Sequence, residues 1–444
     1  MITEITEMLE KKEYKALRST LSELQPADIA ELFGELPTDD ITVLFRVLPK
    51  ELAAESFSFM HPDVQKSLID EFTDRELSTI LSELFVDDAV DVIEEMPANV
   101  VKRIIKNVPP EKRDQINMIL RYPKNSTGTI MTTEFVELKA EMTAEDVFKN
   151  IKRSGIDKET VYTCYVTDRA RHLIGVISVK DLIVRSDEGD VGEIMETDVV
   201  SVNVLADKEE AVRDMQKYGF MALPVVDAEN RLVGIITADD ALDVIEEENT
   251  EDIEIMAAIV PSEKTYFMTG VIETCTKRIP WLLFLMISSI FTSKILQYFE
   301  GRLTANAALI AFMPMLMGTA GNAGGQVSVT VIRSLSVGDM DLSDIFRVIW
   351  KEIRVSVISG VILSVVNFGK MMLIDNVTVQ VALVVSVTVF MTVIIAKLIG
   401  AVLPMVAKKI GLDPAVMASP LITTLCDAIS LLLYFKVAEI ILGI

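Results

Sequence analysis

The sequence predicts a multi-domain membrane protein. Its parts should be an all-α region of helical repeats, a tandem α/β repeat, an acidic connecting helix and a membrane domain of five α-helical spans. Three observations lead there. Charge and polarity change sharply near residue 276, prolines recur at a spacing of roughly 12 residues early in the chain, and one α/β pattern occurs twice in the middle.

Charge and apolar side chains are unevenly distributed. Half of the 444 residues are hydrophobic (50%), and the mean hydropathy is +0.38. Residues 1–276 hold 57 of the 66 acidic and 29 of the 42 basic residues, so this part carries a net charge of −28 and the remainder +4. An acidic surface excludes nucleic acid as a partner, because that binding needs Lys and Arg at the phosphates. It favours cations, although solubility alone also explains such a surface.

Residues 1–125 should form the helical N-terminal domain. Marks such as Pro26, Pro37 and Asp74 recur near the first turn of amphipathic runs, as expected at helix starts. One short helix cannot bury its apolar face alone, so the helices should stack as an array. The first residues lack the basic and apolar regions of a cleaved signal peptide, so we expect a cytoplasmic N-terminus.

Residues 126–250 contain the tandem repeat. One copy runs from Met131 to Leu182 and the other from Met195 to Ala241, and each reads β-α-β-β-α. This repeat resembles a pair of CBS domains. The resemblance implies an adenosine nucleotide such as ATP as a ligand, with a purely structural pair as the alternative. The candidate nucleotide-binding residues, a hydroxyl and a carboxylate after the last strand of each copy, are Ser178, Asp181, Thr237 and Asp240.

An acidic amphipathic helix should follow within residues 239–276, from Asp243 to Met256 at least, and then a hinge at Pro261. We assign 251–276 to the connecting (plug) helix. Residues 277–444 form the predicted transmembrane domain. Each of its apolar runs has about 20 residues or more, enough to cross the bilayer. The five predicted spans are 279–299, 307–332, 355–374, 377–406 and 415–442.

Basic residues predict the topology of these spans. Most of those near span ends, including Arg333, Arg347, Lys351 and Lys408, fall on one side, which the positive-inside rule makes cytoplasmic. We therefore expect a multi-pass protein of the cell (inner) membrane. Its N-terminus should be cytoplasmic and its C-terminus outside.

Asp427 is the most informative residue, because a carboxylate midway along a span must meet water, a partner or an ion. It lies on a polar stripe of the fifth span, and the second span carries a similar stripe among glycines that permit close contact. The candidate pore-lining residues of the two stripes are Asn322, Gln326, Thr330, Ser419 and Thr423. The alternatives are bonding between helices, and a counter-ion role for Lys397 toward Asp427.

The lining offers only oxygen ligands, which suit Mg²⁺, Ca²⁺ or Mn²⁺ better than Zn²⁺ or Cu²⁺. A single carboxylate per chain suits Mg²⁺, which keeps most of its waters. An enzyme is disfavoured, because apart from Cys426, which has no base beside it, no His, Cys or second carboxylate lies at that depth. A channel and an ion-coupled carrier remain open, as does another divalent ion such as Co²⁺ or Mn²⁺.

The whole chain resembles the MgtE-type magnesium channels. The specific marks are Tyr122-Pro123 leading to Gly128–Met131, the run Gly321–Gln326, and Asp413 to Asp427. The resemblance implies Mg²⁺ as both substrate and regulatory ligand, and a homodimer with one pore on its two-fold axis. Asp427 of both subunits would hold a largely hydrated Mg²⁺, helped by the backbone near Thr423. Gly325 and Ser419 depart from the amide side chains of some members.

The resemblance also implies regulatory Mg²⁺ sites that close the pore when cytoplasmic Mg²⁺ is high. Gly219 stands where some members have an acidic residue, which leaves one site in doubt. For each acidic position taken alone, a simpler explanation is that it belongs to a solvated helix face. The matching acidic positions are Asp87, Asp88, Asp91, Asp207, Glu209, Asp240, Asp243, Glu248 and Glu251.

Overall fold

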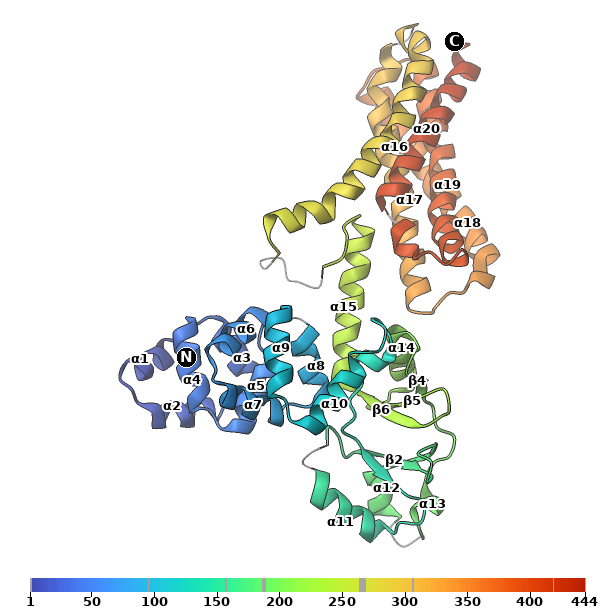
Figure 1. Ribbon diagram of the computed structural model, residues 1–444. Coiled ribbons are helices and arrows are strands. Elements are labelled where there is room, and N and C mark those ends of the chain that lie inside the picture. Colours follow the sequence, from blue (N-terminus) through green and yellow to red (C-terminus); the bar gives the residue numbers. More distant parts are fainter. Residues whose placement is uncertain are drawn as a thin grey trace. The chain divides into compact units, whose positions relative to one another are not determined.

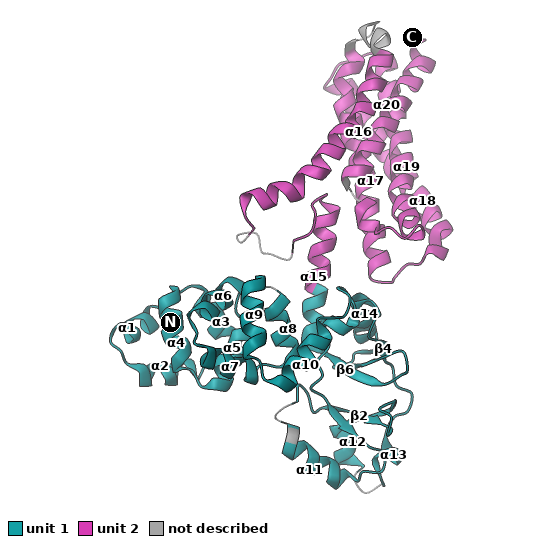
Figure 2. Cartoon of the chain, in the orientation of Figure 1, with its two compact units in different colours: residues 1–245 teal, residues 246–444 magenta. Residues whose placement is uncertain are grey.

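The computed structural model describes residues 2–443 except 95, 156–157, 186–188, 263–268, 306 and 418, and not the side chains of 154, 300–305, 307 and 419. The chain divides into two compact units, residues 1–245 and 246–444 (Figure 2).

The N-terminal domain is an array of short helices (Figure 1). Proline stands at or just before the first residue of most of them from α3 onward, whereas α7 starts with a capping box formed by Thr73 and Glu76. The helices are α1 (Ile2–Glu10), α2 (Tyr14–Leu21), α3 (Pro26–Gly34), α4 (Thr38–Val47), α5 (Lys50–Ser58), α6 (Pro62–Glu71), α7 (Asp74–Glu83), α8 (Val86–Glu94), α9 (Ala98–Asn107) and α10 (Pro110–Ile119).

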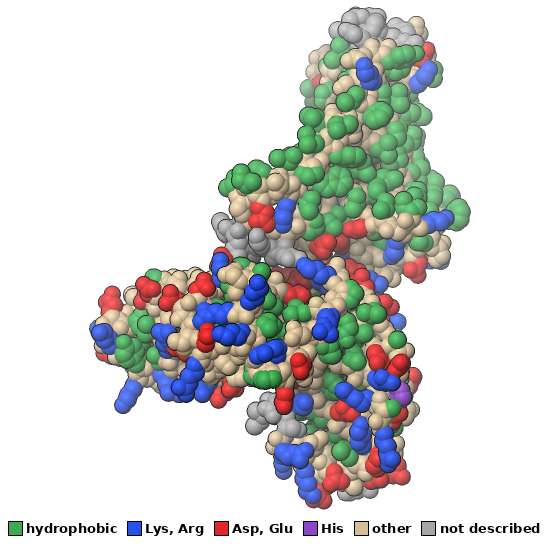
Figure 3. Space-filling model, viewed as in Figure 1, with side chains coloured by type: hydrophobic (Ala, Val, Ile, Leu, Met, Phe, Trp, Pro, Cys, Tyr) green, Lys and Arg blue, Asp and Glu red, His purple; other side chains and the backbone are tan. Residues whose placement is uncertain are grey.

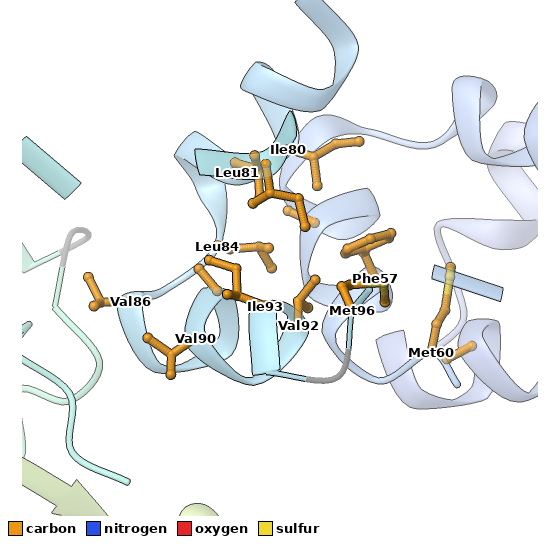
Figure 4. Close-up of a cluster of buried hydrophobic side chains, with 14 of the residues drawn as sticks. Phe57, Met60, Ile80, Leu81, Leu84, Val86, Val90, Val92, Ile93 and Met96 are labelled. Carbon is orange, nitrogen blue, oxygen red and sulfur yellow. The ribbon is translucent and has the colours of Figure 1, made fainter. Parts of the chain in front are cut away.

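Stacking of alternate helices builds the core of this array, because α3 packs on α5, α5 on α7 and α7 on α9. Figure 4 shows Leu81 of α7 near Val92 and Ile93 of α8, all of which are buried. The predicted helical array is thus confirmed. It also fixes α8, whose other face carries three aspartates.

The tandem repeat forms two three-stranded sheets, ordered β1-β2-β3 and β4-β5-β6, each with one parallel and one antiparallel pair. The strands are β1 (Val136–Leu138), β2 (Thr163–Thr167), β3 (Leu173–Ser178), β4 (Val202–Asn203), β5 (Ala222–Val226) and β6 (Leu232–Thr237). The helices are η1 (Thr127–Thr129), α11 (Ala144–Ser154), α12 (Val179–Val184), α13 (Val191–Ile194) and α14 (Lys208–Tyr218). The predicted β-α-β-β-α units are confirmed.

The connecting helix α15 spans Ala238–Met256 and crosses the boundary between the two units. The sequence placed an acidic helix within 239–276, from Asp243 to Met256 at least, and α15 ends at Met256. It stops there because Ala258 adopts a left-handed conformation (φ 58°) that cannot continue an α-helix, and Pro261 follows. Residues 263–268 of the predicted connecting segment 251–276 lie outside the described residues. The next helix begins at Val271.

The second unit consists mainly of five long helices with short 3₁₀ segments between them, so the predicted membrane fold is confirmed. Within the described residues, three stretches are long and apolar enough to cross a membrane by length and composition: Val271–Phe299, Leu342–Leu373 and Val379–Lys409. The elements are α16 (Val271–Ala305), η3 (Ala307–Phe312), α17 (Met313–Ser336), η4 (Leu342–Asp344), α18 (Ile345–Leu373), α19 (Val379–Lys409), η5 (Pro414–Met417) and α20 (Ser419–Leu442).

Candidate functional site

Helices α17 and α20 lie in close contact, as the glycine run predicted. A Cβ atom on Gly321 would lie 2.7 Å from Cγ2 of Thr423, and one on Gly324 would lie 2.7 Å from Cγ2 of Ile422. Any larger residue would therefore push the helices apart. The contact holds Thr423, one turn before Asp427, against α17.

The polar stripe of α17 lies on the face that this chain leaves uncovered. Gly318, Asn322, Gln326 and Thr330 are exposed at four-residue intervals, whereas Ala320, Ala323 and Val327 are buried. The hydroxyl of Thr330 donates to the carbonyl of Gln326 (2.9 Å). Asn322 and Gln326 therefore do not bond helices together within one chain. Their face is open to water, to an ion or to a second copy.

Asp427 is half-buried, and its Oδ1 atom is enclosed without a hydrogen-bond partner. Ser430 donates to the Asp427 carbonyl (2.9 Å), not to the carboxylate. No ion pair within 4.0 Å joins Asp427 to Lys397, and both residues are described. The counter-ion alternative for Lys397 therefore finds no support. A buried carboxylate oxygen in this position calls for a cation.

Ser419 begins α20, but its side chain lies outside the described residues. The predicted pore-lining role of Ser419 thus stays a prediction. Thr423 is half-buried where α20 meets α17, four residues before Asp427.

The second part of α15 packs on the ends of α17 and η5. Ile255 and Met256 cover Ile332 and Ala415. Nη1 of Arg333 donates to Asn249 (3.2 Å), and the hydroxyl of Ser336 donates to Asp252 (3.3 Å). The connecting helix is therefore fixed to the second span by both apolar and polar contacts.

Two acidic residues at this contact escaped the sequence analysis. Burial raises the pKa of Asp252, and the carboxylates of Asp413 and Glu248 raise it further. Glu251, the predicted residue, is exposed beside Asp252. The sequence singled out Asp413 only as the first residue of the family motif from Asp413 to Asp427. It gave no sign that Asp413 lies close to α15.

In the first unit, a crowded acidic cluster forms where α8 meets the start of α15. Burial raises the pKa of Asp87 to about 7, and the Asp88 carboxylate adds to the effect. Burial likewise raises the pKa of Asp88 to about 6, with further contributions from Asp240 and Asp239. The pKa of Asp240 rises to about 8 through burial and the charge of Asp87. Asp91, one turn along α8, is exposed at the rim.

Two further carboxylates of this acidic cluster were not predicted. Burial raises the pKa of Glu159 to about 9, with Asp87 and Asp88 adding to it, and its Oε2 atom has no hydrogen-bond partner. Glu134 accepts a hydrogen bond from the backbone N–H of Val86 (2.8 Å), at the first residue of α8. Both precede strands of the first repeat copy, so no local spacing links them to α8.

One cation is built into the acidic cluster. Nζ of Lys112, on α10, lies 4.0 Å from Glu134 Oε1, and both side chains are largely buried. Burial lowers the pKa of Lys112, while Glu134, Asp87 and Asp88 act against that shift. Within the described residues, no three acidic, His or Cys side chains converge closely enough to chelate one ion. The arrangement therefore suits hydrated ions held by charge more than a tight chelate.

Other predicted regulatory residues, Asp207 and Glu209 among them, interact within their own helix or at its start. Asp207 caps α14 by accepting a hydrogen bond from Glu209 N (2.9 Å), and Glu209 pairs with Arg213 (3.4 Å). Asp243 is exposed on α15, and Gly219 ends α14 in a left-handed conformation (φ 69°) with open space around it. The structure places Asp207 and Glu209 on a different element from the acidic cluster.

The two repeat copies differ at the predicted nucleotide residues. In the first, a cavity of about 460 Å³ is lined by Ser178, Asp181, Arg185 and Phe220, among others. The Ser178 hydroxyl donates to Asp181 (2.5 Å). Thr237 donates equally to Asp240 (2.6 Å), but that carboxylate belongs to the acidic cluster. The carboxylates of the acidic cluster would repel phosphate groups there.

Family models match three stretches of the chain. A divalent cation transporter model, MgtE, matches residues 313–437, the MgtE intracellular N domain matches 24–125, and the CBS domain matches 128–188 and 191–247. The chain is 38% identical to the magnesium transporter MgtE of Thermus thermophilus, over 99% of this chain and 98% of that protein. It is 32% identical to the Bacillus subtilis magnesium transporter MgtE, over 99% and 96%.

Two solved structures resemble the first unit. One is the cytosolic domain of the Mg²⁺ channel MgtE in complex with ATP, with 38% identity and a TM-score of 0.52, covering 55% of this chain and 100% of that one. The other is the soluble part of a magnesium transporter, with 30% identity and a TM-score of 0.53, covering 56% and 97%.

Proposed function

This chain belongs to the MgtE family of divalent cation transporters, and from that premise we propose that it carries Mg²⁺ across the cytoplasmic membrane. The observation that carries the proposal is the enclosed Oδ1 atom of Asp427, without a partner, on a helix packed against the exposed polar stripe of α17. A carboxylate there attracts a cation, and Thr423, Asn322 and Gln326 offer further oxygen ligands.

A homodimer would complete the pathway. The stripe of α17 is exposed in one chain, and polar groups facing hydrocarbon are costly, so we place this face at a two-fold axis between copies. Asp427 of both copies would then face one water-filled passage. Cysteines placed at Thr330 should crosslink into dimers, and cysteines at the exposed Ile362 of α18 should not.

The flux experiment uses the full chain in proteoliposomes. Asp427→Asn keeps the shape but removes the charge, so we expect Mg²⁺ uptake to fall by at least about tenfold, corresponding to roughly 1.4 kcal/mol. The matched control is Glu439→Gln on the same helix, whose carboxylate pairs with Lys436 (2.9 Å). Unchanged uptake by a correctly inserted Asp427→Asn protein would sink the assignment.

Regulation would come from the acidic sites. The carboxylates of Asp87, Asp88 and Asp240 repel each other unless cations lie among them, so the N-terminal and CBS domains should close when Mg²⁺ rises. Because α15 runs without a break from Asp240 to Asp252, closure can be passed to the end of α17. The remaining predicted positions, Asp91, Asp207, Glu209, Asp243, Glu248 and Glu251, would hold further weak Mg²⁺ sites.

We further propose that ATP binds in the first CBS copy, at Ser178, Asp181 and Phe220, because one related structure was solved with ATP and the cavity lies there. The N-terminus would be cytoplasmic and the C-terminus outside. We expect transport without catalysis. Single-channel currents would distinguish a channel from an ion-coupled carrier.

Another divalent ion is the second candidate substrate, because the same oxygen ligands also accept Mn²⁺ or Co²⁺. Competition of each ion against Mg²⁺ uptake decides between the candidates. Equal or better uptake of Mn²⁺ or Co²⁺ at matched concentration would favour this second reading.

A further inference from the structure

Three basic residues share one exposed face at the start of α18. Arg347, Lys351 and Arg354 follow at steps of four and three residues, which places them within about 60° around the helix axis. All three are exposed, and the Arg347 side chain keeps 86% of its surface although it pairs with Asp344. Glu352 falls on the opposite side and is half-buried, so it does not neutralise this face.

The same face continues along α18 as an apolar strip. Ile358, Val361, Ile362 and Val365 project within about 60° of the direction of Arg347. Each leaves between 47% and 66% of its surface exposed. The opposite face carries the residues that pack inside the unit, namely Val348, Ser356, Gly360, Asn367 and Met371. Figure 3 shows that hydrophobic side chains cover most of the visible face of residues 246–444.

Two aromatic side chains flank the basic group. Trp350 and Phe346 are 61% and 82% exposed. The Arg354 guanidinium lies 5.6 Å from the centre of the Trp350 ring, and its Nε atom donates to the Trp350 carbonyl (3.3 Å). Aromatic rings of this kind gather at the level of lipid headgroups. They place Arg354 at the boundary between headgroups and hydrocarbon.

We propose that this face of α18 is a binding site for an anionic phospholipid. The phosphate lies over Arg347, Lys351 and Arg354, and an acyl chain follows the strip from Ile358 to Val365. The 11 residue steps from Arg354 to Val365 rise by about 16 Å, close to half of a bilayer core of about 30 Å. The positive-inside rule explains why basic residues gather on one side of the membrane. It does not explain why three of them lie on the helix face that continues as an apolar strip.

Fluorescence quenching by brominated lipids tests the site. The chain has two tryptophans, so Trp281→Phe leaves Trp350 as the only one. This full-length protein is placed in mixed vesicles of phosphatidylglycerol and phosphatidylcholine. In one series the phosphatidylglycerol is brominated, and in the other series the phosphatidylcholine is brominated. Since each basic residue near an anionic lipid is worth about 1 kcal/mol, we expect Trp350 to prefer phosphatidylglycerol by at least about fivefold.

The triple variant Arg347→Gln, Lys351→Gln, Arg354→Gln should lower that preference to about onefold. Its quenching by phosphatidylcholine should be unchanged, which shows that α18 still faces lipid. Arg278→Gln with Lys409→Gln, at exposed basic residues of α16 and α19, is the matched control and should keep the preference. Equal quenching of the Trp281→Phe protein by both lipids, a preference that survives the triple change, or a Trp350 reached by neither lipid would each overturn the proposal.

Discussion

The acidic cluster of the first unit and Asp427 of the second use the same chemical group in opposite ways. In the cluster, Asp87, Asp88, Asp240 and Glu159 each have a pKa raised by burial and further by neighbouring carboxylates. Asp427 has one enclosed oxygen atom, and among the described residues no other carboxylate acts on its charge. Crowded carboxylates make the fold around them depend on cations, whereas a lone carboxylate attracts a cation without holding it tightly.

The two sites also differ in whether a lysine side chain pairs with their carboxylates. Lys112 supplies a fixed positive charge to the acidic cluster, next to Glu134. Lys397, although it is buried on a neighbouring helix of the membrane unit, makes no ion pair with Asp427. The cluster is therefore partly neutralised by the protein itself, whereas the enclosed Oδ1 atom of Asp427 has no hydrogen-bond partner.

Neutralising the acidic cluster should give the largest effect. In the triple variant Asp87→Asn, Asp88→Asn, Asp240→Asn, like-charge repulsion of roughly 1–4 kcal/mol for each close pair disappears. We expect the first unit to resist trypsin without Mg²⁺ at least about tenfold better than wild type, with little further gain on adding Mg²⁺. The control is Asp39→Asn, Glu51→Gln, Asp63→Asn, on exposed faces of α4, α5 and α6. If the cluster variant kept the wild-type Mg²⁺ dependence, crowding would not be the sensor.

Nucleotide binding tests whether the acidic cluster also makes the two CBS copies differ in their affinity for ATP. Phe220 lines the first cavity and stacks on Tyr218, with ring centres 5.3 Å apart. Phe220→Ala removes a surface on which a base can stack, worth about 1–3 kcal/mol, so we expect ATP affinity to fall roughly tenfold by calorimetry. Thr237→Ala in the second copy should leave ATP affinity unchanged. A large loss from Thr237→Ala instead would move the nucleotide to the second copy.

Without Mg²⁺, closure of the acidic cluster should depend on pH. Asp87 and Asp240 have pKa values raised to about 7 and 8, so their protonated forms favour the closed state. The stabilisation of the closed state by these protons is complete below pH 3.8, the ordinary pKa of an aspartate, and it is lost as the pH rises through about 8. The protection factors of α8 amides in Mg²⁺-free buffer, that is the intrinsic exchange rates divided by the measured rates at the same pH, should be several-fold higher at about pH 5.5 than at about pH 8. Saturating Mg²⁺ should remove most of the difference. The opposite trend with pH would contradict the crowded arrangement.

Removing the built-in cation should have the smallest effect. Lys112→Gln leaves Glu134, Asp87 and Asp88 with one positive charge fewer, so more Mg²⁺ is needed to close the cluster. We expect the Mg²⁺ midpoint of trypsin protection to rise by about two- to fivefold, corresponding to roughly 0.5–1 kcal/mol. Lys102→Gln, exposed on α9, is the control. A lower midpoint would mean that Lys112 mainly repels Mg²⁺.

Patterns that depend on neighbours in sequence were read correctly. Prolines mark the helices of the array, the repeated strands fall where expected, and five long helices follow. The least extent expected for α15, Asp243 to Met256, agrees with its observed end at Met256. The left-handed backbone at Ala258, which stops the helix there, is not visible in residue types. The bounds 251–276 of the connecting segment stay a prediction, because residues 263–268 lie outside the described residues.

Residue types and their spacing were enough to identify an acidic part, a paired α/β module and a membrane part with a carboxylate midway along one span. Those features rest on local periodicity and on the cost of charge in hydrocarbon, which need no knowledge of contacts. The folded chain was needed to show that Glu134, Glu159 and Lys112 join Asp87, and that the charge of Asp413 acts on Asp252. These residues come from elements far apart in the chain, and charges interact through distance in space.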